Sequence, residues 1–287
     1  MTPARGPQAR RIALLALAVL GGALLVFVAV TRWTVPSDEY AYWQAAERLV
    51  AGQPLYDPGA TVGTPYAYWY PPPLAQVLAP LTVLISDEVF GAAWTALLLG
   101  CLWWLGLRRV AVALALVAFL PVAIELWYRN VHLVLAALVV LALRRSPLFW
   151  IPAAAIKITP ILGLVYLLAR GRVREAVLVG AVGSVVLAVS LALSLDAWGL
   201  FLEFVVRQGG GSGASLVPVP FPVRFAAAVA MAIVAGRLPE RQGEVLLVVA
   251  IVLGNPTLWT TAFSMLSAIV PLWQTSRRPA ATAPAAG

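Results

Sequence analysis

The sequence predicts an all-α polytopic membrane protein, and three observations support this prediction. Of the 287 residues, 62% are hydrophobic and only 11% are charged, whereas soluble domains carry about 25% charged residues. The mean hydropathy is +0.90. The hydrophobic residues form long apolar runs, as membrane helices require. We expect a single transmembrane domain over residues 1–273, followed by a disordered tail over residues 274–287, in which Pro279–Gly287 is a low-complexity segment of Ala, Pro and Thr.

The first apolar run predicts an uncleaved membrane helix. Ile12–Val30 contains 19 residues without a charge and follows Arg5, Arg10 and Arg11. The apolar region of a signal peptide has only about 7–15 residues, so this run is too long for one. Basic residues before it place the N-terminus in the cytoplasm and the following residues on the outer face.

The polar interval Ser37–Pro73 is predicted to form most of a first outer loop over residues 34–73. It contains four of the twelve acidic residues and six of the eight tyrosines. Residues 38–51 are typical of a short amphipathic helix, with Ser37 as its N-cap and Gly52 as its end. The three prolines at 71–73 are expected to end the loop and begin the next helix.

Nine further apolar runs follow this loop. They are Leu74–Ile85, Val89–Leu107, Val110–Trp127, Val131–Leu143, Leu148–Ala169, Ala176–Leu195, Val223–Ala235, Val245–Leu253 and Thr257–Trp273. Several are shorter than the roughly 20 residues of a simple span, which favours broken helices beside a cavity. If every run crosses, there are ten helices. Keeping the arginine pairs 108–109 and 144–145 inside requires re-entrant segments and gives about eight.

Residues 196–222 are predicted to form a second outer loop. They contain the segment Gly209–Gly213 and three prolines. The loop is either a flexible linker or a mobile gate over an active site. It lacks the context and the following Lys-Ser/Thr of a phosphate-binding loop.

The net charge of +8 does not indicate a nucleic-acid partner. The arginines come in pairs between apolar runs, as in loops that set topology and contact phospholipids. The single cysteine, Cys101, excludes an intrachain disulfide and is expected to be packing. The single histidine, His132, binds no metal by itself, and we expect neither a metal nor another cofactor.

Lys157 is the only lysine in the chain and stands in an apolar run without another charge. An ammonium at a helix centre costs roughly 2.5–3.5 kcal/mol on insertion scales, so such a residue suggests a function. It either snorkels to an interface or pairs with a carboxylate, or it faces an anionic headgroup. Pro160 would free backbone groups near it.

A polar cluster separates two apolar runs, namely Glu125, Tyr128, Arg129, Asn130 and His132. It is either a short polar turn, or Asn130 and His132 line the same cavity as Lys157. Glu125 is a candidate partner for the charge of Lys157 or of Arg129.

Asp38 and Glu39 stand directly after the first helix. Acidic residues are common at the start of a helix because they stabilise it. The position beside a tyrosine-rich loop makes Asp38 a candidate functional carboxylate as well. No order of residues indicates nucleophilic hydrolysis or the use of a nucleoside triphosphate.

Several segments together resemble glycosyltransferase family 87, over roughly Trp33–Arg174. They are Asp38-x-x-x-Tyr42-x-x-Ala45-Ala46, Gly52-x-x-Leu55-Tyr56, Tyr70-Pro71-Pro72, Ala79-Pro80-Leu81 and Ala155-Ile156-Lys157-x-Thr159-Pro160. The family usually shows Gly-Gln-x-Asn where this chain has Arg129-Asn130-Val131-His132. The chain also looks short for the family in its C-terminal half.

The resemblance implies a GT-C-type helical bundle with a catalytic first outer loop. It implies inverting transfer of mannose from a polyprenyl-phosphate donor to a glycan or glycolipid of the cell envelope, at the outer face of the cell membrane. Asp38 would be the general base, and Lys157 would bind the donor phosphate, helped by His132, Arg129 and Asn130. The expected sugar and acceptor contacts are Tyr42, Glu39, Trp69 and Tyr70.

Two alternatives remain at this point. One is a transporter or flippase of a lipid-linked or anionic substrate, which an intramembrane lysine and broken helices also suit. The missing internal repeat speaks against it. The other is an inactive scaffold of cell-envelope assembly, which the short chain and the changed amide positions favour.

Overall fold

The computed structural model describes residues 6–32, 37–57, 66–209 and 215–274, and every regular element among them is helical. The N-terminal half contains α1 (Pro7–Arg32), α2 (Asp38–Val50), α3 (Pro72–Thr82), α4 (Asp87–Leu105), α5 (Val110–Val117), α6 (Leu120–Tyr128) and α7 (His132–Arg144). The central part contains η1 (Pro147–Phe149), α8 (Trp150–Ile156), η2 (Thr159–Ile161), α9 (Leu162–Ala169) and α10 (Val173–Leu193). The remainder contains α11 (Leu195–Gly209), α12 (Phe221–Arg237), α13 (Glu240–Leu253), η3 (Thr260–Ala268) and α14 (Ile269–Gln274).

The described residues include three helices that are long and apolar enough to cross a membrane, namely α1, α4 and α10. The pair α5 and α6 supplies a fourth if it counts as one span. Other apolar helices, such as α7, are shorter. The fold is thus an all-α polytopic membrane protein, as predicted, and the expected count of eight to ten crossings stays a prediction.

The run Val110–Trp127 is not one straight helix. It divides into α5 and α6, whose axes differ by 85°. Pro121 explains the break, because proline has no backbone N–H and its ring clashes with the carbonyl four residues earlier. That carbonyl belongs to Val117, the last residue of α5. The bend directs α6 toward the polar cluster that follows it.

The run Leu148–Ala169 is also interrupted. It forms η1, α8, η2 and α9 in succession. The helix α8 ends at Ile156, and the next residue, Lys157, has the extended dihedral angles φ −148° and ψ 137°. Pro160 lies in the first turn of η2. The break therefore leaves Lys157 at a helix end, where its side chain departs from the helix surface.

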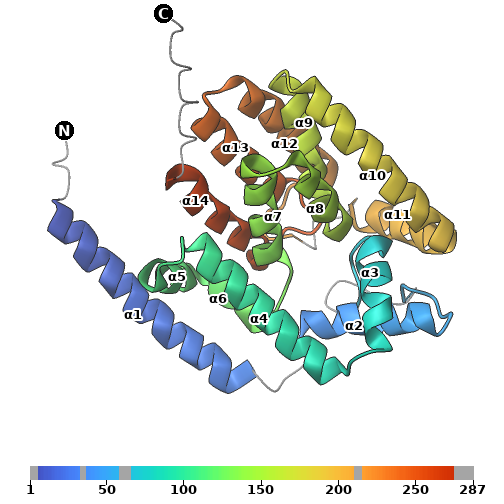
Figure 1. Cartoon of the computed structure of the whole chain (residues 1–287), viewed down its shortest axis with the longest axis horizontal. Coiled ribbons are helices and arrows are strands. Elements are labelled where there is room, and N and C mark those ends of the chain that lie inside the picture. Colours follow the sequence, from blue (N-terminus) through green and yellow to red (C-terminus); the bar gives the residue numbers. More distant parts are fainter. Residues whose placement is uncertain (1–5, 33–36, 58–65, 210–214, 275–287) are drawn as a thin grey trace, which may run out of the picture.

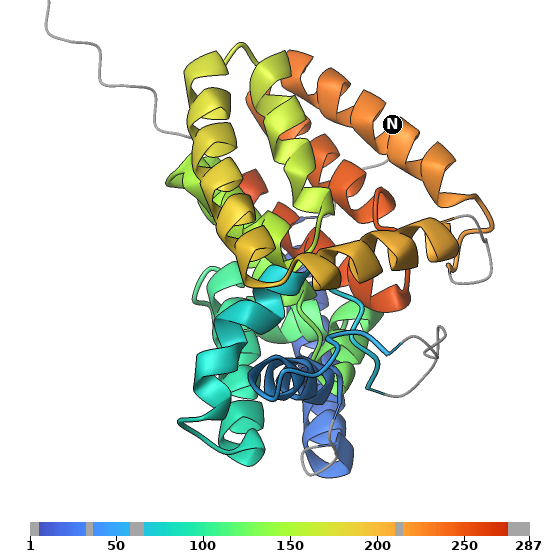
Figure 2. The ribbon, with the colours of Figure 1, turned by 90° about the vertical axis from the view of Figure 1, so that its right-hand side faces the viewer.

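Figure 1 shows α1 along one side of the molecule, against α5, while α9, α12 and α13 gather at the opposite end. The contact between α1 and α5 is close at Gly21, where an added Cβ would lie 1.7 Å from the Leu114 carbonyl oxygen. Figure 2 shows α10 beside α9 and α11 crossing below them. Between these two groups, α1 with α5 and α9 with α12 and α13, lies the helix α7.

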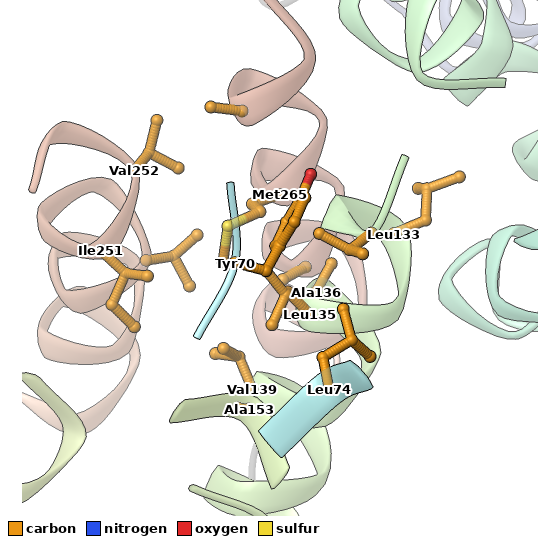
Figure 3. Packing of buried hydrophobic residues seen from close by; sticks show 14 of the residues in the cluster. Tyr70, Leu74, Leu133, Leu135, Ala136, Val139, Ala153, Ile251, Val252 and Met265 are labelled. Carbon is orange, nitrogen blue, oxygen red and sulfur yellow. The ribbon is translucent and has the colours of Figure 1, made fainter. Parts of the chain in front are cut away.

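The helix α7 lies at the centre of the buried core. It contacts α4, α8 and η3, and most of its residues are inaccessible to solvent. Figure 3 shows Tyr70 from the first loop among Leu133 and Ala136 of α7 and Met265 of η3. The polar loop is therefore anchored inside the hydrophobic core by an aromatic side chain.

The predicted helix over residues 38–51 is present as α2. Ser37 precedes it, but its hydroxyl donates to the carbonyl oxygen of Trp127 at 3.2 Å and does not cap the helix. Gly52 follows the helix with a φ of +66°, a conformation that glycine adopts without strain. Pro72 and Pro73 begin α3, as expected.

Most of the second predicted outer loop is helical, which the sequence reading did not anticipate. Residues 195–209 form α11, whose Phe201 and Phe204 are buried. The Phe204 ring stacks on Trp69 with ring centroids 4.5 Å apart. Residues 210–214 of the predicted loop over 196–222 lie outside the described residues, and so do residues 275–287 of the tail predicted over 274–287, whose first residue, Gln274, ends α14.

Candidate active site

Polar residues from segments that are distant in the chain line one cavity of about 550 Å³. It is lined by Asp38, Ala41, Tyr42, Tyr66, Ala67, Trp69, Tyr70, Ile124, Tyr128, Asn130, His132, Lys157, Thr257, Trp259, Thr260 and Thr261. Seven of the nine residues predicted for the site are among them. The other two, Glu39 and Arg129, do not line it.

Asp38 is the first residue of α2 and is held by a network of neutral groups. The Asn130 amide nitrogen donates to an Asp38 carboxylate oxygen. The Asn130 amide oxygen accepts from the Tyr70 hydroxyl at 3.0 Å, and Tyr70 in turn accepts from the Tyr42 hydroxyl at 3.0 Å. A second bond, from the Val131 backbone N–H at 2.7 Å, fixes the orientation of the Asn130 amide.

Burial raises the pKa of Asp38 to about 6. The hydrogen bond from Asn130 opposes this shift, Glu125 adds to it by repulsion, and Lys157 opposes it by attraction. A carboxylate with this pKa is largely ionised at neutral pH and is still basic enough to accept a proton. It therefore has the properties of a general base.

Lys157 supplies the cation of the cavity. Its ammonium nitrogen lies 2.7 Å from His132 Nε2 and 5.5 Å from the centre of the Tyr70 ring. On its other side, His132 Nδ1 lies 3.0 Å from an oxygen of Glu125, whose side chain is completely buried. The structure thus connects Glu125 to Lys157 through His132. Lys157 is one of the two partners that the sequence suggested for Glu125.

Glu39 and Arg129 pair with each other. The distance between the Arg129 guanidinium and the Glu39 carboxylate is 2.9 Å, and both side chains are buried. Arg129 has a left-handed backbone, with φ 51° and ψ 45°, and its carbonyl oxygen accepts from Trp94 Nε1 at 2.8 Å. Because Asn130 comes next in the chain, this arrangement sets the position of the amide that contacts Asp38.

One wall of the cavity was not predicted from the sequence. Thr257 and Trp259 lie between α13 and η3, Thr260 and Thr261 begin η3, and we had expected all four within an apolar membrane run. The side chain of Arg224 fixes the chain ahead of this wall by donating to backbone carbonyls of Leu253, Asn255 and Pro256. The polar stretch Asn255–Thr257, with its proline, is the signal that could have revealed it.

Three further aromatic side chains lie at the cavity with large exposed fractions. Tyr66 is 41% exposed, Tyr128 is 45% exposed and Trp259 is 47% exposed. By contrast, Tyr42 and Tyr70, which were predicted to contact sugar, are buried. The exposed rings offer faces to a ligand, whereas the buried tyrosines support the polar network beneath it.

The described residues contain no group of three or more His, Cys, Asp or Glu side chains that could hold a metal ion. Cys101 is a partly buried free thiol, and burial within α4 accounts for it as packing. The cavity therefore offers a carboxylate, an ammonium, hydroxyls and aromatic faces.

The fold and this cavity define an all-helical membrane protein with a carboxylate and a lysine at one site. The chain matches the model of glycosyltransferase family 87 over residues 68–286, which are 219 of its 287 residues. It therefore belongs to glycosyltransferase family 87, as the sequence resemblance implied, and is a membrane glycosyltransferase. Trp69, Tyr70, Asn130, His132 and Lys157 lie inside the matched segment, whereas Asp38, Glu39 and Tyr42 precede it. Comparisons with curated proteins and with solved structures give no match.

Proposed function

We propose that this glycosyltransferase transfers a hexose, expected to be mannose, from a polyprenyl-phosphate donor to a hydroxyl group of a cell-envelope glycan or glycolipid. The reaction takes place at the outer face of the cell membrane and inverts the anomeric centre. One observation supports this proposal most strongly, namely that Asp38 and Lys157 line the same cavity. A sugar transfer from a lipid phosphate needs a base for the acceptor and a cation for the leaving group.

Asp38 acts first, as the general base. It takes the proton of the acceptor hydroxyl as the acceptor oxygen forms its bond to the anomeric carbon. The bond between that carbon and the phosphate oxygen breaks, and its electron pair stays with the phosphate. The carboxylate thereby becomes neutral, so one negative charge leaves the acidic side of the cavity.

The same charge appears on the departing lipid phosphate. A phosphodiester carries one negative charge, and the released monoester carries up to two because its second pKa is about 6. Lys157 stabilises this developing charge. Electrostatic stabilisation by a fixed group is usually the largest single contribution to lowering the energy of such a transition state. His132 supports Lys157 on this side, Asn130 holds Asp38 on the other, and Arg129 acts through its pair with Glu39.

The sugar and the acceptor occupy the aromatic part of the cavity. Trp69 is partly exposed and is fixed by its stacking on Phe204. Tyr66, Tyr128 and Trp259 add further exposed rings, and the threonines at 257, 260 and 261 add hydroxyl groups. Tyr42 and Tyr70 support Asp38 from below through Asn130.

A transfer assay tests the proposal directly. Membranes containing the wild-type protein are given radiolabelled polyprenyl-phosphate-mannose and a cell-envelope glycolipid extract, and labelled product is measured. Wild-type membranes should form product, and Asp38→Asn should abolish it while the protein stays folded in the membrane. Glu88→Gln, which changes an exposed carboxylate at the start of α4, is the matched control and should retain activity.

Two outcomes would contradict the proposal. Product formation by Asp38→Asn would remove the general base. Movement of the labelled lipid across the bilayer without transfer, in wild type and variant alike, would instead support a flippase.

A further inference from the structure

His132 lies between a completely buried carboxylate and the only lysine of the chain. Its two ring nitrogens are both engaged, Nδ1 with Glu125 at 3.0 Å and Nε2 with Lys157 at 2.7 Å. All three side chains come from different elements, α6, the start of α7 and the end of α8. None of these helices requires this connection in order to form, so the connection needs a separate explanation.

The side chain of Glu125 is bonded to the backbone at the start of α7. One of its oxygens accepts from the backbone N–H groups of His132 at 2.5 Å and Leu133 at 3.2 Å. These are the first two residues of α7, whose N-terminal end carries the positive pole of the helix dipole. Backbone donors and the dipole favour the ionised carboxylate, whereas its burial favours the neutral acid.

With Glu125 ionised, the hydrogen-bond chemistry fixes the protons on the other two groups. An ionised carboxylate only accepts, so the proton of a neutral imidazole must be on Nδ1. Nε2 then carries a lone pair and accepts, which makes Lys157 the donor. An ammonium group has three donors, and the bond to His132 uses one of them. Lys157 therefore has further N–H donors for the cavity that it lines.

We propose that Glu125 and His132 form a positioning relay that keeps Lys157 protonated and fixed against the cavity, ready for an anionic phosphate ester. The relay consists of Glu125, the Nδ1–H tautomer of His132, and Lys157. Its use for a lipid phosphate rests on the proposed function, but the protonation pattern does not. It gives Glu125 a role, and it makes His132 a positioning residue behind Lys157 where the sequence suggested a phosphate ligand.

The competing interpretation is that Glu125 only stabilises the start of α7. In that case its removal would lower stability but would not affect the proton equilibrium of Lys157. The titratable groups that face Lys157 are His132 and Glu125 behind it, Asp38 in the same cavity, and the ring of Tyr70. An experiment must therefore observe the lysine and the histidine themselves.

The chain allows this because it contains one lysine and one histidine. The full-length protein is labelled with ¹⁵N-histidine and ¹³Cε-lysine in lipid nanodiscs, so each NMR spectrum contains one residue of interest. At pH 7 we expect the Nδ1–H tautomer of neutral His132. A protonated imidazolium or the Nε2–H tautomer would overturn the proposal, and this measurement needs no variant that could fail to fold.

A second measurement tests the coupling to Glu125. The ¹³Cε signal of Lys157 is followed as the pH is raised, in wild type and in Glu125→Gln. Removal of the buried anion should lower the pH at which Lys157 loses its proton by about one unit. Glu88→Gln should leave that pH unchanged, and an unchanged value in Glu125→Gln would overturn the relay.

Adding phytanyl phosphate, an alkyl phosphate without a sugar, separates the relay from the proposed function. It should shift the Lys157 signal in wild type, and inorganic phosphate at the same concentration should shift it less. The relay stands without the proposed function if the NMR results hold and no sugar is transferred. The proposed function stands without the relay if transfer occurs and Lys157 titrates independently of Glu125.

Discussion

The two charged sides of the cavity are supported in opposite ways. Asp38 is bonded to the neutral amide of Asn130, behind which lie the hydroxyls of Tyr70 and Tyr42. Lys157 is bonded to His132, behind which lies the buried carboxylate of Glu125. A fixed counter-ion beside Asp38 would hold it in one protonation state, whereas a proton acceptor must change its charge in each turnover. A cation that stays charged gains from a permanent partner, because an unpaired buried charge is costly.

The largest effect on activity is expected when the cation, Lys157, is removed. Lys157→Met should lower kcat/KM for the polyprenyl-phosphate-sugar donor by about 100-fold or more, the usual loss when a transition-state charge loses its stabilising group. Donor affinity, measured with phytanyl phosphate, should fall as well. An unchanged donor affinity would show that Lys157 is structural.

The same variant leaves Glu125 buried without its counter-charge, so a control for folding is needed. The double variant Lys157→Met with Glu125→Gln removes both charges and restores neutrality. It should recover the thermal stability of the protein in detergent but not its activity. Recovery of activity would show that the loss came from the unbalanced carboxylate and not from the missing cation.

The acidic side can be tested by changing the pH. Burial raises the pKa of Asp38 to about 6, so the carboxyl group becomes protonated and unable to accept a proton as the pH falls below that value. kcat/KM should therefore decrease tenfold per pH unit below about pH 6 and reach a plateau above it. Asn130→Ala removes the hydrogen bond that opposes this shift, so its decline should begin at a higher pH. A decline that starts near pH 4 in wild type would contradict the burial of the base.

The smallest effect is expected at Arg129, which does not line the cavity and directly precedes Asn130. Its left-handed backbone costs a residue with a side chain about 1 kcal/mol, a strain that glycine avoids. Both Arg129→Ala and Arg129→Gly lose the pair with Glu39, but only the alanine variant keeps the strain. The glycine variant should therefore be more stable to heat by a few degrees, as measured by thermal unfolding in detergent. Equal stability would show that the backbone at this position is not strained.

The sequence predicts the helices well where length and composition decide. Ile12–Val30 lies within α1 because an uninterrupted apolar run of that length has one stable form in a membrane. The break at Pro121 was missed because the residues around it are apolar, and periodicity alone does not tell a straight helix from a bent one. The helix α11 was missed because glycines and prolines nearby favoured a loop.

The site was predictable where single residues were unusual for their surroundings. Lys157 and Asp38 stood out because of a charge in an apolar run and a position directly after the first helix. The pair of Glu39 and Arg129 is separated by 90 positions, so only the folded structure shows that these residues neutralise each other. The wall at Thr257–Thr261 consists of uncharged residues, and composition does not distinguish it from a membrane helix.

The left-handed backbone at Arg129 also predicts a pattern of variation among related sequences. A glycine at this position needs no support from a side chain, and it would leave an acidic residue at position 39 buried without a cation. Relatives with glycine at position 129 should therefore have an uncharged residue at position 39. Relatives with a basic residue at position 129 should keep aspartate or glutamate there, so the two positions should change together during evolution.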